Sequence, residues 1–262
     1  MLIDAHVHVT EDGKWFGTRH DASVERLLRE MDEAGVTRSV LLPIAGTIAN
    51  ERVADLCRRH PGRFIGFGSV EAGRGATAEG IRAEVARVRA LGLSGLKVHP
   101  RMQGVAPDSA TADAILSGAA EAGLPVVFCG YQQCVSPEVS LDELAPYNYD
   151  RLAKRHPGAT IVIAHMGGHR ALDAYYVAKS NPNVYLDASF VFSALRETSV
   201  YRDLLFILRH LDRRVIFGSD FPEVSPAAYA RQVLGEMARF EDCDAEAVCS
   251  GNLLSILPEG HA

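Results

Sequence analysis

The chain has 262 residues, of which 47% are hydrophobic and 23% charged, with a formal net charge of -6 and a pI of about 5.9. This composition is typical of a globular protein with a large core, and the lack of a Lys/Arg-rich run argues against a nucleic-acid partner. The sequence has no apolar stretch long enough for a membrane span and no signal pattern at its start, so we expect a cytoplasmic protein with no membrane partner.

Short apolar runs alternate with longer amphipathic stretches along the chain, which predicts strands that alternate with helices. In chain order we expect a strand at 2–8, a helix at 22–33, a strand at 39–42, a helix at 48–59, a strand at 64–68, a helix at 78–90, a strand at 95–99, a helix at 111–122, a strand at 125–129, a helix at 149–155, a strand at 159–164, a helix at 170–180, a strand at 184–187, a helix at 201–211, a strand at 215–217 and a helix at 227–239.

This alternation predicts an α/β fold. Eight strand–helix units in about 250 residues indicate a single (β/α)8 TIM-type barrel domain over residues 1–262, with a short C-terminal helical tail near 246–257. A doubly wound open sheet is the alternative. It calls for a GxGxxG loop after the first strand, and that loop is absent.

The first predicted strand contains the pattern His6-Val7-His8. Side chains alternate faces along a strand, so His6 and His8 point the same way and can bind one metal ion through neutral imidazoles. The alternative is two ordinary histidines near the start of a chain.

Other polar residues follow the later predicted strands at the point where each one ends. The catalytic residues of a barrel enzyme sit at the carboxyl ends of its strands, and buried polar groups are costly unless paired. This position therefore predicts an active site. The strand-end residues are Lys97, His99, Cys129, His165, Asp187 and Asp220.

Four of these motifs resemble those of the amidohydrolase superfamily, and specifically its amidohydrolase-related branch of small metal-dependent hydrolases and aromatic-acid decarboxylases. The resemblance implies a somewhat distorted barrel and a divalent metal, for which we expect zinc, as one ion rather than two. The motifs are Asp-Ala-His-Val-His at 4–8, Gly-Leu-Lys-Val-His-Pro at 95–100, Ala-His-Met-Gly-Gly at 164–168 and Gly-Ser-Asp-Phe-Pro at 218–222.

The resemblance also implies roles for individual residues. His6 and His8 match the first-strand metal ligands, and Asp220 matches the eighth-strand aspartate that ligates metal and moves a proton. His165 matches a histidine that is a ligand in two-metal members and polarises the substrate or shuttles protons in one-metal members. Lys97 stands near the bridging carboxylated lysine of two-metal members, and the alternative is a buried, paired cation.

One position departs from the family pattern. Cys129 occupies the place of the usual fifth-strand histidine. A thiolate is a competent zinc ligand, so Cys129 is either a metal ligand or a small buried filler residue. The five cysteines are scattered and form no CxxC pair, which argues against a disulfide framework. Cys134, in the long loop at 130–147, is a further candidate for the pocket.

Several residues near the predicted site are candidates for substrate binding. They are Trp15, Lys97, His99, Tyr131 and Gln132. For His99 the alternative is a structural hydrogen bond before the turn at Pro100. For Trp15 the alternative is a side chain that covers the mouth of the barrel.

Three functions follow from these expectations. The first is hydrolysis of a small ester, lactone or amide by a metal-activated water, with Asp220 and His165 as the catalytic residues. The second is a metal-dependent, non-oxidative decarboxylase (a lyase) of an aromatic or unsaturated acid. The third is a metal-free barrel that binds a ligand or uses only His and Asp for acid–base chemistry. In each case the partner is a small molecule, and a homodimer is a further possibility by analogy with similar barrels.

Overall fold

The computed structural model describes residues 1–73, 75–132 and 139–260. Within them parallel strands alternate with helices, which confirms the predicted fold class. One sheet has the strand order β1-β2-β3 and a second has the order β4-β5-β6-β7-β8-β9. The strands are β1 (Ile3–Val7), β2 (Arg38–Leu41), β3 (Phe64–Gly66), β4 (Gly68–Ser69), β5 (Leu96–Val98), β6 (Val126–Phe128), β7 (Ile161–Ile163), β8 (Val184–Asp187) and β9 (Val215–Ile216).

The two sheets join into a closed barrel. Phe67 interrupts the predicted strand at 64–68, and its backbone N–H donates to the carbonyl oxygen of Leu41 at 3.1 Å. On one side of Phe67, β3 pairs with β2, and on the other, β4 pairs with β5. At the opposite seam the backbone N–H of Ala5 donates to Phe217 O at 3.0 Å. The first and last strands of the chain are therefore neighbours, and His6 lies close to the segment that carries Asp220.

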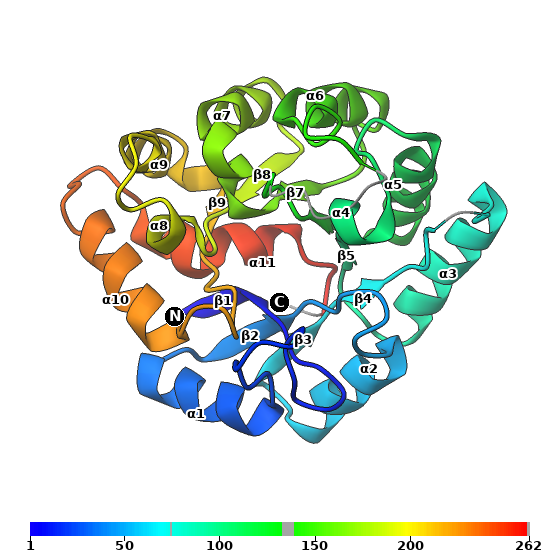
Figure 1. Ribbon diagram of the computed structural model, residues 1–262, viewed down its shortest axis with the longest axis horizontal. Helices are drawn as coiled ribbons and strands as arrows, with labels where there is room; N and C mark the ends of the chain where they lie inside the picture. The colour runs from blue at the N-terminus through cyan, green and yellow to red at the C-terminus, as the bar shows by residue number, and fades with distance from the viewer. Residues whose placement is uncertain (74, 133–138, 261–262) are drawn as a thin grey trace.

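The helices form an outer ring around the strands (Figure 1). They are α1 (Val24–Ala34), α2 (Asn50–Arg59), α3 (Ala78–Ala90), α4 (Pro100–Gln103), α5 (Ala110–Ala122), α6 (Pro146–Arg155), α7 (Ala171–Ser180), α8 (Val191–Ala194), α9 (Val200–His210), α10 (Pro226–Met237) and α11 (Asn252–Ile256), with short turns η1 (Ala164–Arg170), η2 (Asp212–Arg214) and η3 (Ala247–Gly251). The short helices α4 and α8 were not expected from the sequence.

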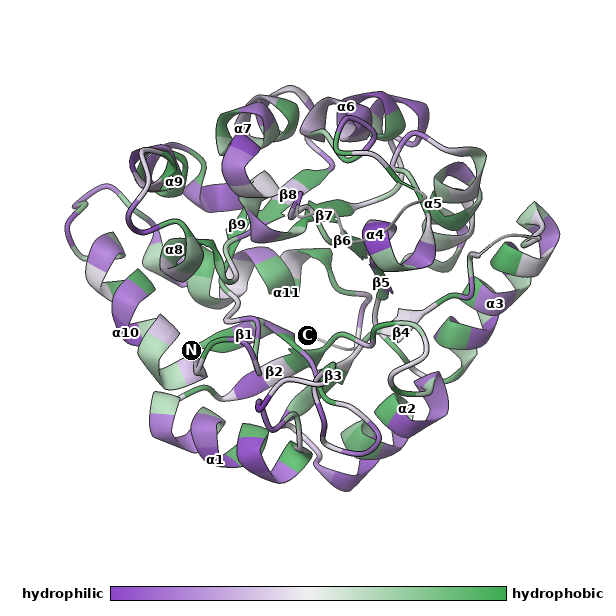
Figure 2. Cartoon of the chain, viewed as in Figure 1, coloured by the Kyte–Doolittle hydropathy of each residue, from purple (hydrophilic) through white to green (hydrophobic). Residues whose placement is uncertain are grey.

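Local signals in the sequence explain where some helices begin and end. The side chains of Ser23 and Ser109 accept a hydrogen bond from a backbone N–H in the first turns of α1 and α5. Both helices end at a glycine in the left-handed conformation, Gly35 with φ 67° and Gly123 with φ 65°. Figure 2 shows hydrophobic residues along the strands and on parts of the helices, as expected for helices that bury one face.

The C-terminal tail closes one end of the barrel. In Figure 1, α11 crosses the interior of the ring of helices. Its Leu253 belongs to the same apolar cluster as Ile3, the first residue of β1. Apolar side chains therefore fill the end of the barrel at which the strands begin. An active site can lie only at the other end, where the strands finish. Other members of the cluster are Ala5, Val40, Ile65, Val127, Val162 and Ile216.

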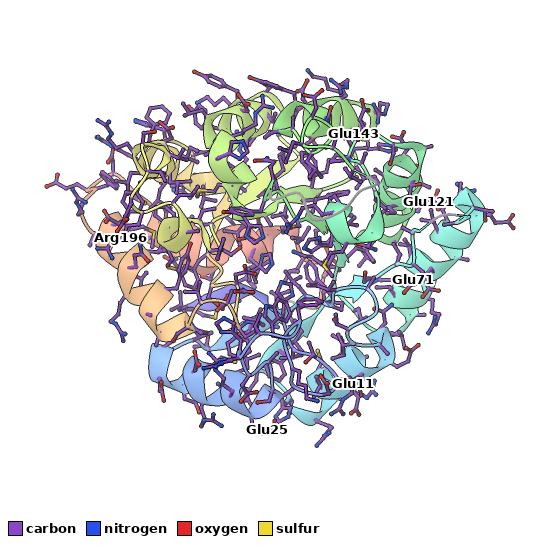
Figure 3. The ribbon with its side chains drawn as sticks, in the orientation of Figure 1. Glu11, Glu25, Glu71, Glu121, Glu143 and Arg196 are labelled. Carbon is purple, nitrogen blue, oxygen red and sulfur yellow. The ribbon has the colours of Figure 1, made fainter. Side chains whose placement is uncertain are left out.

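Charged side chains such as Glu25 and Glu121 project from the outer surface of the ring (Figure 3). In the described part of the chain, no helix combines the length and the apolar character that crossing a membrane requires.

Candidate active site

Residues with metal-binding or acid–base side chains gather where the strands end. His6 lies on β1 and His8 follows it, while Lys97 lies on β5 and His165 follows β7. Asp220 follows β9 and comes beside β1 through a backbone hydrogen bond of 2.9 Å from its N–H to His6 O. All of these side chains are almost completely buried. A group of buried polar side chains at this end of a barrel is the arrangement expected of an active site.

Three atoms of the type that ligates metal converge in this group. The Nε2 atoms of His6 and His8 lie 3.2 Å apart, and Asp220 Oδ1 lies 3.5 Å from the first and 3.4 Å from the second. A tetrahedral ion with bonds of about 2.0–2.1 Å separates its ligand atoms by roughly 3.3–3.4 Å. The three atoms therefore have the spacing of three corners of a coordination shell.

The second nitrogen of each histidine is held by a hydrogen-bond acceptor. His6 Nδ1 donates to the carboxylate of Asp187, and His8 Nδ1 donates to Leu42 O at 2.6 Å. These contacts place the ring protons on Nδ1 and leave both Nε2 lone pairs directed toward Asp220. Burial holds the pKa of His6 well below its usual value, so its ring is neutral, the form that ligates metal. The residues present therefore fit a divalent ion.

The backbone at Asp220 adopts a strained conformation. Its φ is 72°, in the left-handed region that non-glycine residues seldom adopt. Burial alone would raise the pKa of Asp220, but the nearby charge of His165 holds that pKa well below its usual range. Asp220 is therefore an anion facing two imidazoles.

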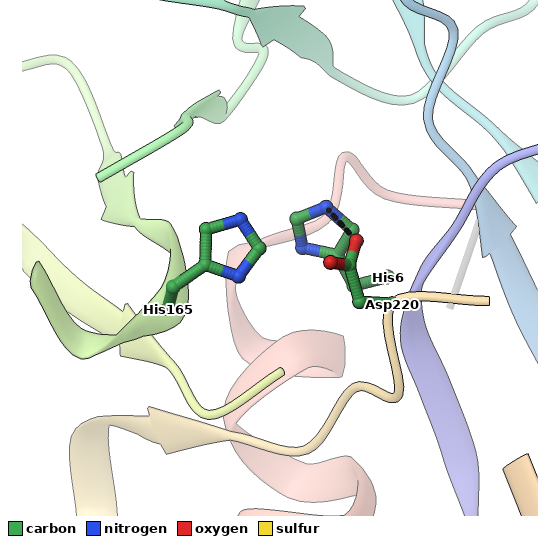
Figure 4. A group of neighbouring side chains, drawn as sticks. All are labelled: His6, His165 and Asp220. Carbon is green, nitrogen blue, oxygen red and sulfur yellow. Dashed lines mark ion pairs between the residues drawn. The ribbon is translucent and has the colours of Figure 1, made fainter. Parts of the chain in front are cut away.

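His165 lies in a second strained segment, because φ is positive at each residue from His165 to Gly168. Its Nδ1 lies 3.2 Å from Ser189 O and 3.0 Å from Ser189 Oγ. Burial lowers the pKa of His165, but the charges of Cys129 and Asp220 outweigh burial and raise that pKa to about 9. A ligand atom of His165 lies within 4.8 Å of those of His6 and Asp220, and Figure 4 shows the three side chains together, with a dashed line for the ion pair between His6 and Asp220. His165 is a proton donor at neutral pH.

Cys129 is surrounded by hydrogen-bond donors. The Nη2 of Arg101 lies 3.6 Å from its Sγ, and the side chains of His99 and His165 also form hydrogen bonds with it. Burial would raise the pKa of Cys129, but the charges of these two histidines and their hydrogen bonds hold it well below its usual value. The surroundings of Cys129 therefore favour the thiolate form of its side chain.

These groups open onto a cavity of about 570 Å³. One wall is aromatic: the ring of Trp15 stacks on His8 with 5.2 Å between the ring centroids, and its indole N–H donates to Glu223. Tyr131 and Phe190 also line the cavity, and their rings meet edge to face at 5.3 Å. Residues that line the cavity include His8, Trp15, Phe16, Lys97, His99, Arg101, Cys129, Tyr131, His165, Phe190 and Asp220.

Most residues expected to bind substrate lie at this cavity. Trp15, Lys97, His99 and Tyr131 all line it. Gln132 does not line it; its side chain is 6% exposed and packs against Gly168. Cys134 lies outside the described residues.

Ser189 is a site residue that the sequence analysis missed. It is fully buried, and its Oγ lies 3.1 Å from His6 Nδ1 and 3.0 Å from His165 Nδ1. Its backbone N–H donates to Asp187 Oδ1 at 2.6 Å. The alternation Asp187-Ala188-Ser189 after a predicted strand was the available signal, since residues two apart share a face.

The fold and the site together define a TIM-type barrel with a candidate His/His/Asp metal site. The family model described as amidohydrolase matches residues 3–252, and the chain therefore belongs to that family, which confirms the resemblance seen in the sequence. No curated protein matches the chain.

Solved structures confirm the barrel. The structure of an uncharacterised TIM-barrel protein from Bordetella bronchiseptica matches with a TM-score of 0.83 and 19% identity, over 97% of each chain. A dihydroxybenzoic acid decarboxylase from Polaromonas sp. JS666, with bound manganese and the inhibitor 2-nitroresorcinol, matches with a TM-score of 0.69 and 18% identity, over 97% of this chain and 96% of its own. A probable 2-pyrone-4,6-dicarboxylic acid hydrolase from Acinetobacter baumannii, with citric acid bound, matches with a TM-score of 0.65 and 16% identity, over 97% of this chain and 98% of its own.

Proposed function

We propose that this protein is a metal-dependent hydrolase of a small ester, lactone or amide, with one zinc ion as the resident metal. The observation that carries the proposal is the triangle of His6 Nε2, His8 Nε2 and Asp220 Oδ1, with edges of 3.2–3.5 Å. Both histidines are already in the tautomer that ligates metal, because acceptors hold their Nδ1 protons. Membership of the amidohydrolase family supports the same reading.

Each residue of the site has its own role in the proposed reaction. His6, His8 and Asp220 would hold a divalent ion, which would lower the pKa of a bound water to about 7 and polarise a carbonyl oxygen. Asp220 accepts the proton of the attacking water and passes it to the leaving group. His165, protonated at neutral pH because its pKa is raised to about 9, donates a hydrogen bond to the oxyanion that forms. The aromatic wall at Trp15 and Phe190 limits the access of bulk water.

Decarboxylation of an aromatic acid is the second candidate. It is favoured by the basic side chains Lys97 and Arg101, which line the cavity and suit a carboxylate. A decarboxylase with bound manganese is also among the structural neighbours. Both reactions use the same metal site.

The test begins with the metal content of protein purified without chelators or a nickel column. We expect about one equivalent of zinc per chain. Hydrolysis of p-nitrophenyl acetate and of small lactones should fall at least about a hundredfold in Asp220→Asn, while Asp12→Asn, in an exposed loop, serves as the control. Release of carbon dioxide from 2,6-dihydroxybenzoate, with no ester hydrolysis, would favour the decarboxylase. Metal below about a tenth of an equivalent, with undiminished activity in Asp220→Asn, would exclude both metal-dependent reactions.

A further inference from the structure

The cavity over the candidate metal site has a polar end and an apolar end. At the polar end the side chains of Lys97, His165 and Asp220 are buried. Two large apolar side chains also line the cavity but remain in contact with solvent: Phe16 is 51% exposed and Met102 is 44% exposed. Phe16 and Met102 therefore lie at the mouth of the cavity, and a long substrate that reacts at Asp220 extends toward them.

Phe16 has an unfavourable backbone conformation for its residue type. Its φ is 43° and that of Gly17 is 72°, and the N–H of Thr18 donates to Trp15 O at 2.8 Å across them. Tight turns with a positive φ at both central residues favour Asn and Gly at these positions, because a larger side chain is strained there. A phenylalanine in such a turn gains little from burial when half of it is exposed. Strained residues of this kind are typical of sites that hold a ligand.

Contacts between rings connect Phe16 to the metal site. The ring of Phe16 meets that of Trp15 edge to face, with 4.6 Å between the ring centroids and an interplanar angle of 65°. Trp15 is held in turn by its stacking on His8 and by the hydrogen bond from its indole N–H to Glu223. The exposed ring of Phe16 therefore continues an aromatic surface that begins at His8.

Met102 lies on the short helix α4, which is anchored at both ends. The side chain of Gln103 donates a hydrogen bond to Val70 O at 2.8 Å and accepts one from the backbone N–H of His99 at 2.5 Å. The thioether side chain of methionine is flexible and polarisable, so it adapts to apolar groups of different shapes. A fixed helix thus presents an adaptable apolar side chain at the mouth of the cavity.

We propose that Phe16 and Met102 bind an apolar acyl chain of the substrate, so that the enzyme selects esters with a chain longer than acetyl. This inference rests on the proposed function for its reaction and adds the class of substrate. The cavity of about 570 Å³ has room for such a chain, since cavities of about 300–1,000 Å³ hold drug-sized ligands. Each methylene that leaves water for an apolar surface should strengthen binding about two- to fourfold.

The first test compares p-nitrophenyl acetate, butyrate and hexanoate as substrates of the full chain. The leaving group is the same in all three, so differences in kcat/KM report the acyl chain. We expect kcat/KM to rise at least about fivefold from acetate to butyrate. Phe16→Asn and Met102→Gln should each lower this ratio at least about threefold. Phe206→Asn and Leu234→Gln should leave the ratio unchanged, because both side chains are exposed to a similar extent but do not line the cavity.

Thermal unfolding of Phe16→Asn distinguishes a role in substrate binding from a role in folding. Asparagine tolerates the left-handed conformation better than phenylalanine does, so the Tm of this variant should equal or exceed that of the parent protein. A lower butyrate-to-acetate ratio without a fall in Tm assigns the ring to the substrate. A fall in Tm with an unchanged ratio would make Phe16 a structural residue and overturn the inference.

A binding measurement separates this inference from the proposed function. Trp15 contacts the ring of Phe16, so its fluorescence can follow titration with sodium acetate, butyrate and hexanoate without turnover. We expect hexanoate to bind at least about tenfold more tightly than acetate, and Phe16→Asn to remove most of this difference. The same result in a protein that hydrolyses no ester would refute the hydrolase and leave the apolar site standing.

Two other outcomes would overturn the inference alone. The first is ester hydrolysis in the parent protein with no preference for the longer chains. The second is a dimer of the parent protein that dissociates in Phe16→Asn during size-exclusion chromatography, which would assign the exposed ring to a second copy of the chain.

Discussion

The Nζ of Lys97 lies 3.0 Å from the Nε2 of His6, the same nitrogen that points into the triangle with His8 and Asp220. Lys97 is 1% exposed, and burial lowers its pKa. A single lone pair cannot accept a hydrogen bond from an amine and ligate a metal at the same time. The ion and Lys97 therefore compete for His6.

This competition predicts that Lys97→Met binds metal more tightly than the parent protein. Methionine keeps much of the volume of the lysine stem but neither donates to His6 nor repels a cation. We expect zinc affinity to rise at least about tenfold, on the order of 1.4 kcal/mol. Competition with a chromophoric chelator measures it, and Lys14→Met, whose side chain is 83% exposed in the parent, is the control. A fall in affinity would instead make Lys97 part of the metal site.

Trp15 should report metal binding by its fluorescence. It is the one tryptophan of the sequence, and its ring stacks on His8 at 5.2 Å with an interplanar angle of 19°. A cation on His8 changes the charge felt by the indole, so zinc should change the emission and saturate at about one equivalent. His8→Gln should abolish the change. A change that persists in that variant would place the ion elsewhere.

Gly218 should be essential to the position of His6. A Cβ at residue 218 would lie 2.7 Å from His6 Cβ and 3.0 Å from His6 N, so alanine forces β1 and the loop apart. We expect Gly218→Ala to lower the free energy of unfolding by about 1–3 kcal/mol and to weaken zinc binding. Gly235 lies inside α10 with nothing within 4 Å of an added Cβ, and Gly235→Ala should gain about 0.5–1 kcal/mol. Urea unfolding measures both, and equal effects would contradict the role of Gly218.

The features that the sequence predicted best are those set by local periodicity. The alternation of apolar runs with amphipathic stretches predicts the barrel. The catalytic residues of a barrel lie at the carboxyl ends of its strands, and this rule predicts that His6, His8 and Asp220 lie close together. Ser189 was missed because its importance depends on contacts with His6 and His165, which are 183 and 24 residues away. No local pattern encodes such a contact.

Backbone conformation was the other feature of the site that the sequence did not predict. The left-handed run that begins at His165 and the positive φ of Asp220 are unfavourable for these residue types, so propensity does not predict them. They persist because the surrounding packing and hydrogen bonds fix them, which is typical of functional sites. Similarly, Gln132 was expected at the substrate because it follows the end of a strand, but its side chain turns toward Gly168.

Asp113 predicts a pH dependence of stability far from the active site. On α5, its Oδ1 accepts hydrogen bonds from Arg155 Nε at 2.9 Å and from His156 Nε2 at 2.7 Å, which tie α5 to α6. Burial would raise the pKa of Asp113, but these two partners hold it below the usual value. A carboxyl group whose pKa is lower in the folded chain stabilises the fold above its unfolded pKa, about 3.9, and loses that contribution as the pH falls through its folded pKa.

We therefore expect Asp113→Asn to lower the free energy of unfolding at pH 7 by up to about 1 kcal/mol, a small value because the side chain is partly exposed. The difference from the parent protein should shrink as the pH falls below about 4, where the aspartate of the parent becomes protonated. Urea unfolding at several pH values measures the difference, and a double-mutant cycle with Arg155→Gln isolates the pair. A cost that is unchanged between pH 7 and pH 3 would mean that the contact acts through packing, with no contribution from charge.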